Sequence, residues 1–339
     1  MQHVGAIAVA DRGLMRTKLF ATVVVAALCS PCAATLAIAQ TYPSKPVRFI
    51  VPFPPGSGVD IVTRVLAQKL GERWNQTVIT DNRAGAGGGL GATLVAKSAP
   101  DGYTLLMGNL GTHALNPHLY ENLSYDPLRD FAPVTQVASV PSMLVVHPNL
   151  PVRSASALIA LAKARPGQLN YGSAGIGSAG HLAGELLGSM TGINLVHIAY
   201  KGNQQALTDL IVGEVQLTFG NLLSMLPHVQ TGRVRGLAVT SRQRSAAAPD
   251  IQTMVEAGVP GYVVTQWYGI FAPAQTPQDI SARLHADTIA VLKLEDVRTR
   301  ITRDGADIVG DTPGQFIAHI KAENERWAKV IKAANIRPQ

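Results

Sequence analysis

One stretch of this sequence decides the fold that we expect: residues 48–60, which read RFIVPFPPGSGVD. The short apolar run at its start predicts a buried strand, and the prolines and glycines that follow predict a tight turn. Beyond the turn, apolar residues recur three or four positions apart and predict a helix over 59–73, with one face formed by Val59, Val62, Val65, Leu66 and Leu70. A strand, a glycine-rich turn and a helix form the repeating unit of an α/β fold.

The same unit recurs along most of the chain. Further strands are expected at 77–80, 103–107, 143–146, 169–171, 195–198, 216–219, 236–240 and 266–272. Helices are expected at 88–97, at 156–164, from 180, from 204, at 224–230 and at 313–334. This alternation is typical of parallel sheets covered by helices on both faces.

The chain has 339 residues, and the roughly 300 that remain without the first 39 exceed one ordinary core, which predicts two α/β lobes. The first lobe is expected to comprise 40–142 and 265–339, since the helical tail after Pro277 needs a partner to pack on. The second lobe is expected at 143–264. The chain then crosses between the lobes twice, near Pro141 and near 263–266, and forms a hinge. Ligands of open α/β sheets bind beyond the carboxyl ends of the strands, so the cleft between the lobes is the expected site.

The first 39 residues have the order of a cleaved secretory signal. Arg12, Arg16 and Lys18 form a basic start, residues 19–28 form an apolar run, and residues 37–39 read AIA, a small-residue cleavage site. The apolar run is shorter than the roughly 20 residues that a membrane-spanning helix needs. We therefore expect removal of 1–39 and export to the periplasm, with Met15 as an alternative start of translation.

Both cysteines of the chain, Cys29 and Cys32, lie in this segment. Neither follows the Leu and small residue that a lipid-attachment site requires, so a lipid anchor is disfavoured. The mature chain then has no thiol for catalysis or metal binding, which suits an oxidising compartment.

The net charge of the chain restricts the classes of binding partner that we expect. The net charge of +7 falls to about +5 when the expected signal is removed. This mild excess, without long basic runs, does not indicate nucleic-acid binding. It either favours an anionic small molecule, by raising its local concentration, or serves solubility alone.

Four glycine- and hydroxyl-rich turns stand between a predicted strand and a predicted helix, at 52–60, 108–114, 171–178 and 200–203. Each leaves unpaired backbone N–H groups at a helix start, where the helix dipole adds partial positive charge. Such turns either cradle a carboxylate without an arginine or are ordinary connections of an α/β fold.

Enzyme signatures are missing from the sequence. Residues 175–180, GIGSAG, match the dinucleotide pattern GxGxxG, but the acidic residue expected about 20 positions later is absent. The chain has no GxSxG, phosphate-loop or HExxH motif, so no cofactor and no metal are expected. A secreted α/β hydrolase that uses His113 or His181 stays a rival reading.

Several motifs in one order resemble the extracytoplasmic solute receptors of the tripartite tricarboxylate transporter family, also called the Bordetella uptake gene receptors. They are YPSKPV at 42–47, FPPG at 53–56 with Asp60, NRAGAGG at 82–88, PDGYTL at 100–105, YGSAG at 171–175, His197 with YKG at 200–202, and WYGIFAP at 267–273. The resemblance covers the whole mature chain. It implies a periplasmic-binding-protein type II-like fold whose two lobes close on a carboxylate.

The resemblance also implies which residues face the ligand. From the first lobe they are Phe53, Pro54, Gly56, Ser57 and Asp60, with Asn109, Thr112, His113 and Ala114 nearby. From the second lobe they are Ser173, Gly175, Ser178, His181, Tyr200, Lys201 and Gly202, with Asn221 as a further candidate. Trp267 and Tyr268 are expected either to wall the pocket or to lie in the core. Ser57, where the family often has glycine, and Ala199, where it often has proline, set this chain apart from its relatives.

We therefore expect a receptor, not an enzyme, that binds a small mono- or dicarboxylate, aromatic and amino acids included. Its expected partners are the permease subunits of a tripartite transporter, and it is expected to act as a monomer. A receptor that signals to a membrane sensor is the alternative.

Overall fold

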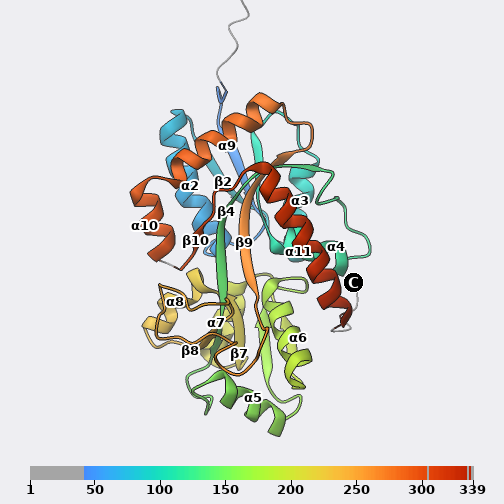
Figure 1. Ribbon diagram of the computed structural model, residues 1–339, viewed down its shortest axis with the longest axis vertical. Coiled ribbons are helices and arrows are strands. Elements are labelled where there is room, and N and C mark those ends of the chain that lie inside the picture. Colours follow the sequence, from blue (N-terminus) through green and yellow to red (C-terminus); the bar gives the residue numbers. More distant parts are fainter. Residues whose placement is uncertain (1–41, 304, 334–335, 337–339) are drawn as a thin grey trace, which may run out of the picture. The chain divides into compact units, whose positions relative to one another are not determined.

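The computed structural model describes residues 42–303, 305–333 and 336 (Figure 1). The predicted secretory signal at 1–39 lies outside these residues. Within them, no helix combines the length and the apolar character that crossing a bilayer demands.

The chain alternates strands and helices, as the sequence predicts. The strands are β1 (Val47–Val51), β2 (Val78–Asn82), β3 (Thr104–Asn109), β4 (Phe131–Val146), β5 (Asn170–Ser173), β6 (Val196–Ala199), β7 (Leu217–Asn221), β8 (Arg235–Val239), β9 (Thr265–Pro273) and β10 (Asp307–Ile308). The α-helices are α2 (Gly58–Trp74), α3 (Gly89–Ala96), α4 (Asn116–Leu119), α5 (Ala155–Ala164), α6 (Ala179–Thr191), α7 (Asn203–Val212), α8 (Leu222–Gln230), α9 (Gln278–Leu292), α10 (Glu295–Arg303) and α11 (Pro313–Ala333). A 3₁₀ turn, η1 (Ala86–Gly88), and a π-helical turn, η2 (Gly111–Leu115), complete the list.

The strands of the described residues form one mixed sheet in the order β2-β1-β3-β9-β4-β7-β5-β6, and β8 and β10 also pair with β4. Pairs joined through a crossover helix are parallel, as in β1 with β2 and β5 with β6. The pairs that involve β4 or β9 are antiparallel. The expectation of purely parallel sheets is therefore wrong, because these two strands carry the chain in opposite directions.

One long strand joins the two regions of this sheet. β4 pairs with β9 through its first part and with β7 and β8 through its last five residues, from Ser142 to Val146. We call β2, β1, β3, β9 and β10 the first region, and β7, β5, β6 and β8 the second region. Figure 1 shows β4 and β9 running side by side from one region into the other.

The sequence predicted only the end of β4, because Pro133 and Pro141 interrupt it. Proline has no N–H to donate and is expected at edges or bulges rather than inside a sheet. Here Pro133 lies beside a register irregularity, and the short β10 pairs only with Ser139 and Ala138 of β4. The edge of β4 that faces away from β9 therefore forms few hydrogen bonds, and the missing N–H groups of the prolines are tolerated there. The segment before residue 143, which was expected to be a loop, is a strand.

Three apolar clusters hold the layers together. One packs α2, α9 and α10 on the first region, a second packs α3, η2 and α11 on the other face and continues to α5 and α6, and a third lies under α7 and α8. The α/β fold class predicted from the sequence is confirmed.

The C-terminal helix α11 closes one face of the first region. Its Phe316 is fully buried against Trp267, with ring centroids 5.4 Å apart, and Asn324 donates a hydrogen bond to the carbonyl of His113 in η2. The tail is therefore part of the core that supports η2.

We expect Phe316→Ala to lower the free energy of unfolding by about 3–5 kcal/mol, because it leaves a cavity where an aromatic ring was fully buried. The neighbouring Ile317 is 36% exposed, so Ile317→Ala serves as the control and should have a much smaller effect. Urea denaturation of the two variants measures the difference, and equal losses would contradict the packing of α11 described above.

Candidate functional site

The turn between β1 and α2 places an unused hydroxyl group at a helix start. Ser57 is the N-cap residue of α2, yet its side chain does not cap the helix. Its Oγ is buried and makes no hydrogen bond to any described residue, whereas Ser178 and Asn221 each accept an N–H of the helix that follows them. A buried hydroxyl group without a hydrogen-bond partner is energetically costly, so the hydroxyl of Ser57 is available to form a hydrogen bond with a bound molecule.

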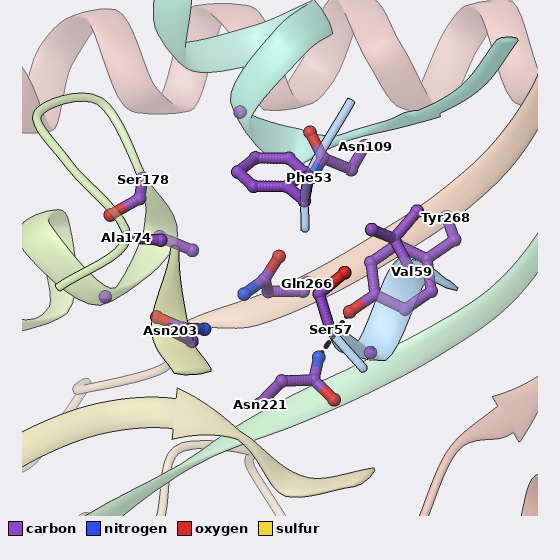
Figure 2. A pocket seen from close by; sticks show the side chains of 14 residues that line it. Phe53, Ser57, Val59, Asn109, Ala174, Ser178, Asn203, Asn221, Gln266 and Tyr268 are labelled. Carbon is purple, nitrogen blue, oxygen red and sulfur yellow. Dashed lines mark hydrogen bonds between the residues drawn. The ribbon is translucent and has the colours of Figure 1, made fainter. Parts of the chain in front are cut away.

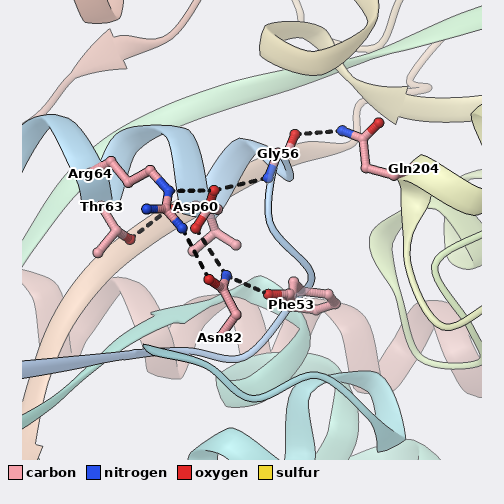
Figure 3. A network of polar contacts seen from close by, with 8 residues as sticks. Phe53, Gly56, Asp60, Thr63, Arg64, Asn82 and Gln204 are labelled. Carbon is pink, nitrogen blue, oxygen red and sulfur yellow. Dashed lines mark hydrogen bonds and ion pairs between the residues drawn. The ribbon is translucent and has the colours of Figure 1, made fainter. Parts of the chain in front are cut away.

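A network centred on Asp60 fixes the shape of this turn (Figure 3). Asp60 Oδ2 accepts hydrogen bonds from the N–H of Gly56 and from Arg64 Nε, both at 2.9 Å. Asp60 Oδ1 accepts one from Asn82 Nδ2, which also donates to the carbonyl of Phe53. The carboxylate thus holds both ends of the segment from Phe53 to Gly56.

The same contacts set the protonation of Asp60. Burial by itself would raise the pKa of this carboxyl, but the hydrogen bonds from Arg64, Gly56 and Asn82 outweigh burial and hold the pKa below its ordinary value. Asp60 is therefore ionised at neutral pH, and its charge is neutralised within the network.

The second region brings its own turns to the same place. Asn221, at the end of β7, caps α8 through the N–H of Leu223 and donates a hydrogen bond to the hydroxyl of Tyr268 on β9. Gly58, the first residue of α2, lies so close to both side chains that a β-carbon there would overlap them. The starts of α2 and α8 therefore meet at β9.

Two further contacts join segments of the two regions. Gln204 Nε2 donates to the carbonyl of Gly56, and Tyr120 donates from its hydroxyl to the carbonyl of Ile176 at 3.0 Å. Next to the first contact, a β-carbon on Gly202 would lie 2.6 Å from Pro54. The turns of the two regions are thus in direct contact.

These turns line a narrow pocket of about 30 Å³, shown in Figure 2. The polar side chains that line it are those of Ser57, Asn109, Ser178, Asn203, Asn221, Gln266 and Tyr268. The remainder of the lining comes from Phe53, Gly58, Val59, Gly111, Ala174, Ala179 and Gly180. None of these residues carries a formal charge, so the pocket offers hydroxyl groups, amides and the first residues of α2, α6 and α7.

Of the residues predicted to face the ligand, five line this pocket: Phe53, Ser57, Asn109, Ser178 and Asn221. Gly175, Tyr200 and Lys201 line a neighbouring pocket, which also includes Phe53 and Ala174. Pro54, Gly56, Asp60 and Gly202 line neither of the two; they belong to the contacts that shape the turns.

The other predicted residues lie behind the pocket. Thr112, His113, Ala114, Ser173 and His181 are buried and line neither pocket. His113 stacks on Phe271 with ring centroids 3.8 Å apart, and burial lowers its pKa to about 3. Burial likewise lowers the pKa of His181 to about 4. Neither imidazole is a cation at neutral pH.

Ser173 holds the turn that follows β5. Its Oγ lies 2.7 Å from His197 Nε2 and accepts a hydrogen bond from the N–H of Gly175. Because Ser173 is fully buried, the pair of serine and histidine supports the turn from beneath.

Sequence reasoning missed Gln266 and Asn203 as lining residues. Asn203 ends one of the four glycine-rich turns, so a signal for it was present. Gln266 lies near the start of β9, where a single glutamine belongs to no recognisable motif. The open question about 267–268 is resolved: Tyr268 lines the pocket, whereas Trp267 is buried against Phe316.

Comparison with known proteins identifies a family and solved structures that this chain resembles. Residues 62–336 match the model of a family described as the tripartite tricarboxylate transporter family receptor. Three solved structures superpose on nearly their whole length. Rpa4515 of R. palustris, solved with adipate, is 39% identical, covers 88% of this chain and 100% of its own, and has a TM-score of 0.86.

The periplasmic binding protein BugD is 33% identical with a TM-score of 0.85, and covers 88% of this chain and 100% of its own. MatC (Rpa3494) from Rhodopseudomonas palustris, solved with malate, is 32% identical with a TM-score of 0.82. It covers 86% of this chain and 100% of its own. These likenesses confirm the two-lobed fold of periplasmic binding proteins. They also confirm a receptor rather than an enzyme, and the hydrolase reading of His113 or His181 is set aside.

We expect Asp60→Asn to lower the free energy of unfolding by about 1–3 kcal/mol, because an amide cannot accept all three hydrogen bonds. Asp296→Asn, which removes an exposed carboxylate paired with Lys69, is the control and should matter far less. Urea denaturation at pH 7 measures both.

The decrease in the free energy of unfolding caused by Asp60→Asn should also depend on pH. Since the folded-state pKa of Asp60 is below its ordinary value, the stabilisation is complete above about pH 3.9 and disappears as the pH falls through the folded-state value. The difference between the wild type and Asp60→Asn should therefore shrink in acid. A difference that is the same at pH 3 and pH 7 argues against the carboxylate.

Proposed function

Because this chain belongs to the tripartite tricarboxylate transporter receptor family, we propose that it captures a small carboxylate in the periplasm and delivers it to a tripartite membrane transporter. The observation that carries this proposal is the unpaired Ser57 hydroxyl in a pocket without formal charge. The relatives solved with adipate and with malate support the same class of ligand.

The chemistry of the pocket suits a carboxylate. Amide hydrogens at a helix start and the hydroxyl of Ser57 are donors that point toward the ligand, and the helix dipole favours negative charge there. Each hydrogen bond to a charged group contributes roughly 1.5–3 kcal/mol. Four or five of them contribute on the order of 6–15 kcal/mol before the costs of binding are subtracted, a range that includes the roughly 8 kcal/mol that micromolar affinity requires.

The roles of the predicted residues divide accordingly in this proposal. Phe53, Ser57, Asn109, Ser178 and Asn221 touch the ligand, together with Asn203 and Gln266. Asp60 and Ser173 are positioning residues, because they hold the turns that carry Ser57 and Gly175.

We further propose that the lobes are those expected from the sequence, with 40–142 and 265–339 as the first and 143–264 as the second. β4 and β9 are then the two connections between them, and the pocket lies between the turns of both. The secretory signal order of residues 1–39 supports the periplasmic location.

Binding is tested with the purified mature chain and a panel of aliphatic, aromatic and amino-acid carboxylates. We expect a raised melting temperature with at least one of them and a micromolar dissociation constant by calorimetry. Ser57→Ala should weaken that binding by about tenfold, because one hydrogen bond to a charged group is lost. A panel without any binder would refute the proposed function.

Ser189→Ala is the matched control, because Ser189 is an exposed serine of α6 and lines neither pocket. It should bind as the wild type does. Uptake of the identified carboxylate by cells with and without this gene then tests delivery to a transporter, and normal uptake without the gene would favour a sensing role.

A further inference from the structure

A second chamber adjoins the pocket on the side of Phe53 and Ala174. It measures about 220 Å³. Its lining comes from Gly85, Ala86, Gly87 and Gly88 on one side, from Gly175, Ile176, Ala199, Tyr200 and Lys201 on the other, and from Tyr120. Phe53 and Ala174 line both spaces. We call the pocket around Ser57 the inner chamber and this one the outer chamber.

The two chambers differ in charge. Lys201 is the one residue with a formal charge among those that line either chamber. It is exposed, and its ammonium group makes no ion pair or hydrogen bond with any described residue; only its backbone N–H is bonded, to Gln205. A cation without an internal partner, at the edge of a cavity, is free to meet an anion that enters it.

The polar groups of the outer chamber are otherwise occupied. The hydroxyl of Tyr200 donates to Asp209, and that of Tyr120 donates to the carbonyl of Ile176. The ammonium group of Lys201 is therefore the available side-chain donor of this chamber. The inner chamber, in contrast, holds neutral donors such as Ser57.

We propose that the ligand is a dianion that occupies both chambers, with one carboxylate in the inner chamber and a second acidic group beside Lys201 in the outer one. This inference rests on the proposed function. The carbon chain between the two acidic groups passes Phe53 and Ala174, the two apolar side chains that the chambers share. Lys201 is then the residue that distinguishes a diacid from a monoacid.

The physical basis is the balance of charge. A monoacid in the inner chamber is held by neutral donors and leaves Lys201 without a counter-charge. A diacid uses the same donors and adds a charge-assisted contact, whose strength is moderated by the exposure of Lys201 and by salt. Discrimination between the two classes therefore resides in the outer chamber.

The test compares straight-chain diacids, from succinate to suberate, with their monomethyl esters, which keep the same carbon chain but lose one charge and gain a methyl group. At low ionic strength we expect the wild type to bind the best diacid about threefold to fivefold more tightly than its ester. Lys201→Met should remove most of this preference while it leaves the affinity for the ester unchanged, and Lys201→Arg should retain it. Lys163→Met removes a charge that is also exposed but lies outside both chambers, and it should behave as the wild type.

Three results would overturn the inference without touching the proposed function: equal affinity for diacid and ester in the wild type, a preference that survives in Lys201→Met, or an equal loss for both ligands in that variant. The last result would mean that Lys201 attracts anions in general. Failure of every carboxylate to bind the wild type would instead overturn the proposed function itself.

Discussion

The antiparallel pairing of β4 with β9 is the constraint on which the remaining structure depends. These two strands are hydrogen-bonded from Phe131 and Pro273 at one end to Pro141 and Thr265 at the other. Beyond that point β4 continues into the second region, where it pairs with β7 and β8. The turn that carries Asn221 follows β7, which pairs with β4, and the turn that carries Ser57 follows β1, which is linked to β9 through β3. A continuous series of paired strands therefore connects the two turns.

A pocket lined by neutral groups is a distinct solution to anion recognition. A buried arginine would have to be desolvated and paired in the absence of ligand, at a cost of several kcal/mol. Oriented amides and hydroxyls avoid that cost, because the helices of α2 and α6 already point their first residues at the pocket. The charged groups nearby are used differently: Asp60 and Arg64 neutralise each other behind the turn.

Much of the fold could be predicted from the sequence, because its elements carry local signals. The apolar spacing of residues 59–70 and the glycine-rich turn before it are sufficient to place β1 and α2. Only the end of β4, at 143–146, could be predicted, since Pro133 and Pro141 are permitted in its earlier part only by the sparse pairing of one edge, which is a property of the assembled sheet.

The candidate site divides in the same way. Ser57 and Ser178 stand beside helix starts and could be selected from sequence. Gln266 could not, because its place in the pocket follows from the pairing of β9. His113 and His181 were candidates because of their residue type, but their surroundings exclude contact with a ligand. The ring of His113 stacks on Phe271, and the ring of His181 packs on His197 with ring centroids 4.3 Å apart.

The contact of Gly202 with Pro54 has a consequence for substitutions at this position. The backbone of Gly202 is extended, with φ of −178°, so any amino acid could adopt that conformation. What excludes a methyl group is the proline ring of the opposite turn, and it does so only while the two turns touch. The side chain of an alanine at this position would collide with the proline ring only in the arrangement in which the two turns touch, so it would disfavour that arrangement.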